Sequence, residues 1–189
     1  VRADREAAPL GREEVAVGLA GVAIAVGGGS IYVGAKLLVG GFMITTAGNG
    51  NGIIANEGSF VGINGAMEFG SVGIGSHMLA ARGSGVVITA NYTISGSAGS
   101  HWSLNQNSRL ICTGRTVTLS GSPVFTNGFV SAIRLSSTTV GGNTFSGATG
   151  AGSLRYKIVG IGLIDTGGGG ATYLPGDTAG TNDGTGVYS

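Results

Sequence analysis

Glycine is the feature that most limits what this chain can fold into. Forty of its 189 residues are glycine, about three times the ordinary share, and they follow no fixed period. Collagen needs Gly at every third position and abundant Pro, whereas this chain has three prolines. The longest apolar stretch, residues 15–26, contains two glycines and is much shorter than the ~20 residues of a membrane-spanning helix. Frequent Val, Ile and Thr argue against disorder, so an ordered, β-rich and elongated structure without membrane insertion is predicted.

Short β-prone runs separated by Gly, Asn and Ser begin at residue 15. Residues 86–89, 92–95 and 116–119 have the length and composition of strands bounded by turns. In the last run Val117 and Leu119 alternate with threonines, as in a strand with one face in a core and one in water. No long polar loop and no helical pattern follows residue 15, which favours an all-β, elongated parallel β-solenoid (β-helix) over a sandwich.

Charge divides the chain into three parts. Seven of the nineteen charged residues lie within residues 1–14, an Ala-rich stretch that predicts a short helical or linker end of a stalk. Residues 15–164 are predicted to form the solenoid body and residues 165–189 a C-terminal capping or tip segment. Glycine has no side chain to bury, so we expect an intertwined or side-by-side homotrimer. The chain begins with Val rather than Met, which favours a piece of a longer protein.

The charged and sulfur-containing residues exclude several functions. The net charge is +1 and the basic residues are scattered, so no nucleic-acid binding is expected. The single cysteine, Cys112, excludes an internal disulfide and a cysteine zinc cluster, and it is interpreted as a small buried strand residue. His77 and His101 are the only histidines and lie far in sequence from most acids. They are interpreted as strand residues with hydrogen-bonded imidazoles, and no metal or cofactor is expected.

Carboxylates are sparse where an enzyme would need them. Glycoside hydrolysis needs two carboxyl groups about 5–9.5 Å apart, yet no Asp or Glu occurs between Glu68 and Asp165. Two alternatives stay open: Glu57 and Glu68 approaching on adjacent coils, and Asp165 with Asp177 in metal or receptor contact. Solvated surface acids and turn-capping aspartates are the simpler interpretation. No catalytic residue is predicted, and a non-enzyme is favoured.

Several segments of residues 86–180, taken in order, carry a resemblance to a known family. They include Ala90-Asn91-Tyr92-Thr93-Ile94-Ser95-Gly96, Gly99-Ser100-His101-Trp102, Thr144-Phe145-Ser146-Gly147, and Tyr173-Leu174-Pro175-Gly176-Asp177. This set resembles the C-terminal region of bacteriophage tail fibre and tailspike proteins, of the right-handed parallel β-helix type. It covers about half of the chain.

The resemblance implies an extracellular location in the virion tail and a homotrimer joined to other phage tail proteins. It also implies a structural and receptor-binding role in host attachment, through a surface glycan or an envelope protein. A polysaccharide depolymerase with an intersubunit or upstream active site is one alternative. A bacterial surface adhesin or secreted β-helix passenger is the other.

Three aromatic residues are candidates for receptor or glycan contact: Trp102, Tyr173 and Tyr188. Neighbouring strand residues face opposite ways, so one of His101 and Trp102 is expected to face outward, and a core position is favoured for Trp102. Pro175 removes a ladder donor, so the solenoid is expected to end near it, with Tyr173 packed across the end. A disordered tail is the alternative.

Overall fold

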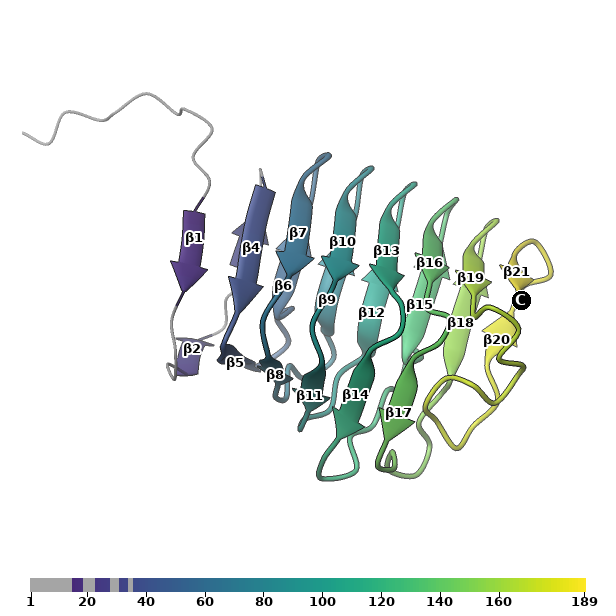
Figure 1. The fold of residues 1–189 in the computed structure, drawn as a ribbon. Coiled ribbons are helices and arrows are strands. Elements are labelled where there is room, and N and C mark those ends of the chain that lie inside the picture. The colour runs from purple at the N-terminus through teal and green to yellow at the C-terminus, as the bar shows by residue number, and fades with distance from the viewer. Residues whose placement is uncertain (1–14, 19–22, 28–30, 34–35) are drawn as a thin grey trace, which may run out of the picture.

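The described part of the chain is a parallel β-solenoid. The computed structural model describes residues 15–18, 23–27, 31–33 and 36–189, and the predicted stalk end, residues 1–14, lies outside them. These described residues form strands, turns and loops without a helix, and each turn adds one strand to each of three parallel sheets (Figure 1). The predicted all-β solenoid is confirmed.

The three sheets run along the length of the solenoid. The eight-stranded sheet contains β1 (Val15–Gly18), β4 (Lys36–Gly40), β7 (Phe60–Ile63), β10 (Gly85–Ile88), β13 (Arg109–Cys112), β16 (Ser137–Thr139), β19 (Leu163–Asp165) and β21 (Val187–Tyr188). The six-stranded sheet contains β2 (Ala23–Gly27), β5 (Phe42–Ala47), β8 (Met67–Phe69), β11 (Tyr92–Ile94), β14 (Thr116–Leu119) and β17 (Thr144–Ser146). The seven-stranded sheet contains β3 (Ile31–Val33), β6 (Ile53–Ala55), β9 (Ser76–Ala80), β12 (Ser100–Leu104), β15 (Val130–Ile133), β18 (Tyr156–Val159) and β20 (Thr181–Asn182).

The length of a turn varies along the solenoid, which explains why the sequence shows no sharp period. One ladder of paired backbone positions steps by between 22 and 28 residues through Val15, Leu37, Val61, Val86, Leu110, Thr138, Ile164 and Tyr188. The strands keep their register while the corners absorb the extra residues. The strands therefore stack in a regular register, although the number of residues per turn changes.

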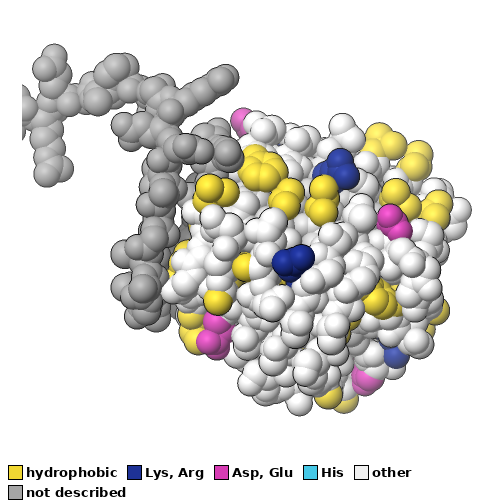
Figure 2. Space-filling model, in the orientation of Figure 1, with side chains coloured by type: hydrophobic (Ala, Val, Ile, Leu, Met, Phe, Trp, Pro, Cys, Tyr) yellow, Lys and Arg dark blue, Asp and Glu magenta, His cyan; other side chains and the backbone are white. Residues whose placement is uncertain are grey.

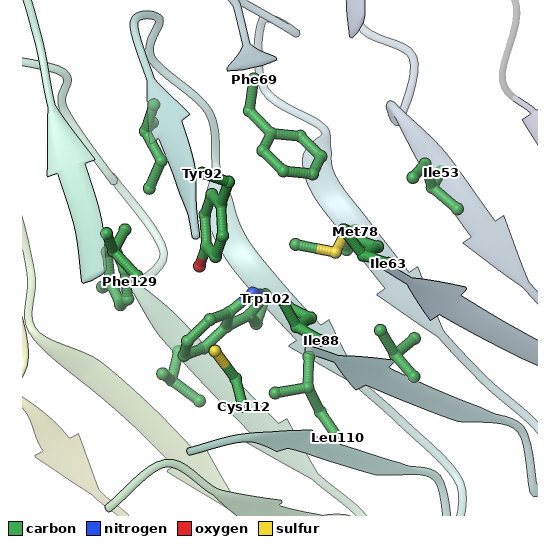
Figure 3. Close-up of a cluster of buried hydrophobic side chains, with 14 of the residues drawn as sticks. Ile53, Ile63, Phe69, Met78, Ile88, Tyr92, Trp102, Leu110, Cys112 and Phe129 are labelled. Atoms are coloured by element: carbon green, nitrogen blue, oxygen red, sulfur yellow. The ribbon is translucent and has the colours of Figure 1, made fainter. Parts of the chain in front are cut away.

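Stacked side chains fill the interior between the three sheets. Each β-strand turns alternate residues inward, so Val117 and Leu119 are buried while the threonines beside them face water, as predicted. Phe69, Tyr92, Trp102 and Phe129 point into one shared interior space (Figure 3). Aromatic ring contacts continue from Phe129 through Phe145 to Tyr173.

His101 and Trp102 are both buried, which corrects the expectation that one of them faces outward. The N–H groups of both residues donate to the carbonyl oxygen of Phe129, at 3.1 and 2.9 Å. Two successive donors on one acceptor mark a local bulge, and the bulge interrupts the alternation. His77 and Met78 on the preceding turn of the same sheet are buried in the same way.

The corner between the seven-stranded and the eight-stranded sheet uses a left-handed backbone in successive turns. We name it the left-handed corner; it comprises residues 57–58, 82–83, 106–107, 134–135 and 160–161. Successive copies are hydrogen-bonded through the backbone, as in Leu135 N–H to Gly160 O at 3.1 Å. Gly58 and Gly83 occupy the second position in the first two copies, as the positive φ favours. Leu135 and Ile161 occupy it in the last two.

The last turn differs from those before it. The six-stranded sheet stops at β17, whereas β20 pairs with β18 and β21 pairs with β19. Ser189 N–H still donates to Ile164 O at 3.0 Å, so parallel pairing extends past Pro175, where the sequence places its end. Leu174 is buried, and these contacts argue against the alternative of a disordered tail.

Candidate binding groove

The three aromatic residues predicted to contact a receptor lie in very different places. Trp102 is fully buried and packs against Phe129, with ring centroids 5.2 Å apart. It therefore belongs to the core, the interpretation that the sequence favours, and offers no ring face to a ligand. Tyr188 stacks on Tyr156 at 4.2 Å and donates its hydroxyl to Gly170 O at 3.0 Å. Tyr173, in contrast, lines the groove described below.

Each acid that could suggest catalysis interacts with its own separate partner. Glu57 forms an exposed ion pair with Arg82 at 2.6 Å, and Glu68 accepts a hydrogen bond from the Ser95 hydroxyl. Asp165 accepts a hydrogen bond from Gly167 N–H at 2.9 Å, as a turn-capping aspartate does. Within the part of the chain that the structure describes, no group of three or more His, Cys, Asp or Glu is placed to hold a metal ion.

A groove of about 420 Å³ lies where the six-stranded sheet ends. It is lined by residues 145, 147–149 and 172–177. They come from β17, from the loop after β17, and from the loop between β19 and β20, which we call the final loop. Its volume falls within the ~300–1,000 Å³ range of small-molecule sites. The groove exists because the last turn supplies a loop, and not a strand, beside β17.

Tyr173 presents its ring, and not its hydroxyl, to the groove. The hydroxyl donates to Val140 O at 2.7 Å and accepts a hydrogen bond from Asn143 N–H at 2.6 Å. Gly169 lies beneath the ring, where an added Cβ would be 2.5 Å from ring carbons. Phe145 stands nearly perpendicular to the ring, with centroids 5.4 Å apart and planes at 78°. The two rings form a rigid, L-shaped apolar surface.

The support beneath this surface is itself fixed by hydrogen bonds. The Asn143 side chain donates to Cys112 O at 2.7 Å and to Val140 O at 3.0 Å, and it accepts from Arg115 N–H at 2.8 Å. Both N–H donors and one of the two acceptor positions of the amide are therefore occupied. A binding surface held in this way loses little conformational entropy when it is occupied.

Asp177 supplies the charge of the groove. Its carboxylate accepts hydrogen bonds from Gly152 N–H at 2.9 Å and from the Thr178 hydroxyl at 3.1 Å. The bond from Gly152 is the leading cause that lowers the pKa of this exposed carboxyl below its ordinary value. A carboxylate has about four acceptor positions, so positions remain for an incoming O–H or N–H group. Asp177 is the one charged residue among those lining the groove.

A chain of hydrogen bonds links the two buried histidines. The sequence predicts a hydrogen-bonded imidazole for each of them, but not the link between the two. His77 Nε2 lies 2.9 Å from Gly70 O, the two Nδ1 atoms are 2.9 Å apart, and His101 Nε2 lies 2.8 Å from the Tyr92 hydroxyl. A carbonyl only accepts, so His77 carries its proton on Nε2 and accepts at Nδ1. His101 therefore donates from Nδ1 and accepts the Tyr92 proton at Nε2.

This order of donors is the one that two neutral imidazoles form. Burial lowers the pKa of His77 to about 3, and burial followed by the neighbouring His77 lowers the pKa of His101 well below its ordinary value. Both rings are inaccessible to solvent, so the pair supports the core and is not a reactive site. The predicted interpretation of hydrogen-bonded strand histidines is confirmed.

Sequence reasoning missed Phe145 as a groove residue. Phe145 continues the inward ladder after Val117, and its strand, β17, is the last of the six-stranded sheet. Only the register shows that the next turn leaves this ring half-covered. A Phe between Thr144 and Ser146 looks in the sequence like any other core residue.

No protein-family model, no curated protein and no solved structure matches this chain. In the described residues, no helix has the length and apolar character to cross a membrane.

Proposed function

We propose that this chain is a structural and receptor-binding segment of a bacteriophage tail fibre or tailspike, located in the virion and attaching it to the host surface. The observation that carries the proposal is a stiff solenoid whose final turn holds a preorganised groove. Parallel backbone pairing along three sheets gives a rod its stiffness. The phage assignment comes from the ordered sequence segments of residues 86–180.

The depolymerase alternative receives less support from the described residues. Glu57 is paired with Arg82, Glu68 with Ser95, and Asp177 with Gly152. Two-carboxylate chemistry needs an acid and a base flanking one bond, and these acids serve separate structural contacts. The function proposed is therefore attachment and not cleavage.

We further propose that the chain works as a homotrimer, and the left-handed corner supports this. Leu135 and Ile161 have φ values of 65° and 66°, and each is 61% exposed. A left-handed conformation costs an L-residue roughly 1–2 kcal/mol, most for a β-branched one. Burial within the chain does not offset this cost, because both side chains face solvent. A contact with another copy would.

Apolar residues of the eight-stranded sheet extend the same surface. Leu163 and Val187 are paired neighbours on the outer face of this sheet and are 38% and 54% exposed. Hydrophobic side chains form a row across the upper part of the face seen in Figure 2. Leu163 and Val187 lie in successive turns, about 4.8 Å apart, and a second copy lying alongside has the same spacing between its turns.

Oligomeric state tests this part of the proposal. Sedimentation of the purified chain is expected to give about three times its 18.5 kDa mass. Leu135→Asn with Ile161→Asn should release monomers that are folded and at least as stable, because Asn tolerates positive φ. Ile74→Asn is the matched control, since Ile74 is 70% exposed and has no positive φ. A folded wild-type monomer at micromolar concentration contradicts the trimer.

Cell binding tests the attachment function. Fluorescently labelled protein is applied to a panel of diverse bacterial strains, and adsorption is measured by flow cytometry. Saturable binding to a restricted set of strains, competed by unlabelled protein, is the expected result. Uniform weak adsorption to every strain, or binding to none, contradicts an attachment role.

A further inference from the structure

We infer that the groove beside β17 binds a saccharide unit without acidic groups, either neutral or amine-bearing. This inference rests on the proposed attachment function and names the class of ligand that the groove accepts. It follows from the apolar rings, the single carboxylate and the rigidity of their support.

The two rings match one half of sugar chemistry. A pyranose ring has an apolar face of C–H groups and an edge of hydroxyl groups. Phe145 and Tyr173, held perpendicular with centroids 5.4 Å apart, offer an apolar floor and wall to such a face. Because the Tyr173 hydroxyl is committed to Val140 and Asn143, the ring binds through its face and not through its oxygen.

Asp177 matches the other half of that chemistry. Its carboxylate keeps free acceptor positions beside the rings, and sugar hydroxyl groups are donors. Its backbone hydrogen bonds lower its pKa, so the group stays negative at neutral pH. An ammonium group on a sugar would form a charge-assisted hydrogen bond with the carboxylate and cation–π contacts with the two rings.

The same carboxylate excludes acidic glycans. No Lys or Arg is among the lining residues, so a uronic acid, a sialic acid or a phosphate would face Asp177 without a counter-charge from the lining of the groove. Two like charges in contact are repulsive, most strongly at low ionic strength. The groove therefore selects by charge as well as by shape.

A glycan array of neutral, amine-bearing and acidic bacterial oligosaccharides tests the inference with the full chain. We expect binding to neutral or amine-bearing glycans only. Phe145→Ala should weaken glycan binding about tenfold, equal to about 1.4 kcal/mol. Asp177→Asn should weaken the binding of amine-bearing glycans most. Phe60→Ala and Asp183→Asn are matched controls: Phe60 is half-buried on another sheet, and Asp183 is an exposed, backbone-bonded aspartate outside the groove.

The results separate the groove from the attachment function. Binding of acidic glycans alone, or binding unchanged in both Phe145→Ala and Asp177→Asn, overturns the inference. If cells are bound while no glycan on the array is, the inference fails and the attachment function stands. If no strain is bound, the attachment function fails, whatever the array shows. Circular dichroism of each variant confirms folding, and Asp177→Asn keeps the test decisive if Phe145→Ala unfolds.

Discussion

Acid should destabilise this solenoid through its two buried histidines, well above the pH at which exposed carboxylates titrate. The ordinary pKa of a histidine is about 6.5, whereas burial lowers that of His77 to about 3. The unfolded chain therefore binds more protons than the folded chain below pH 6.5. The stabilisation is fully present above pH 6.5 and is lost progressively as the pH falls from 6.5 toward 3.

The size of the effect follows from the proton balance. At pH 4.5 the unfolded imidazole favours its protonated form about 100-fold, which lowers the free energy of unfolding by about 2.7 kcal/mol for His77. His101, whose pKa is also lowered well below its ordinary value, adds at most the same amount. The sum approaches the lower end of the ~5–15 kcal/mol that stabilises a typical domain.

Denaturant unfolding followed by circular dichroism, at fixed protein concentration between pH 7.5 and 4.5, measures this loss. Replacing both histidines, as in His77→Gln with His101→Gln, should flatten the slope by up to two protons, about 1.4 kcal/mol per pH unit for each. Nitrogen chemical shifts of the wild-type rings provide a second readout. They should show His77 protonated at Nε2 and His101 at Nδ1 throughout this range. Stability that changes by less than about 0.5 kcal/mol between pH 7.5 and 4.5, or imidazolium signals above pH 5, would refute the reasoning.

Three further perturbations test the core and the groove. Trp102→Ala should lower the free energy of unfolding by about 3–5 kcal/mol, because its ring is fully buried; a change below about 1 kcal/mol contradicts its core role. Cys112, whose pKa burial raises to about 12, should resist thiol reagents at pH 8 until the chain unfolds, and rapid labelling of folded protein would contradict its burial. Gly169→Ala should displace the Tyr173 ring and weaken glycan binding, and unchanged binding in this variant would contradict the role of the ring.

The solenoid was predictable because its signals are local. Alternation in residues 116–119 and turn residues between short strands report the face and the end of each strand without any knowledge of partners. The contact between His77 and His101 was not predictable in the same way. It depends on a 24-residue step between turns, whereas the steps before and after it in the same sheet are 25 and 28 residues. Local patterns therefore predicted two strand histidines with hydrogen-bonded imidazoles, and only the register shows that both are buried and share a hydrogen bond.

The candidate site was harder to predict than the fold for a related reason. Trp102, Tyr173 and Tyr188 are alike as sequence features, since each is an aromatic residue near glycine or a polar neighbour. Their accessibility is decided by the bulge at His101, by the hydroxyl contacts of Tyr173 and by the stacking of Tyr188 on Tyr156. None of these contacts can be predicted from the spacing of the residues in the sequence.

The end of the six-stranded sheet explains why a groove forms in the last turn. A sheet edge exposes unpaired backbone groups and invites pairing with other chains, so the edge at β17 needs a cover. The other two sheets continue by one strand, while the final loop passes beside β17 and fixes itself through Tyr173 and the buried Leu174. A strand in that place would have filled the space over Phe145 with the next inward side chain. A loop leaves the ring half-covered, so the feature that protects the edge also creates the groove.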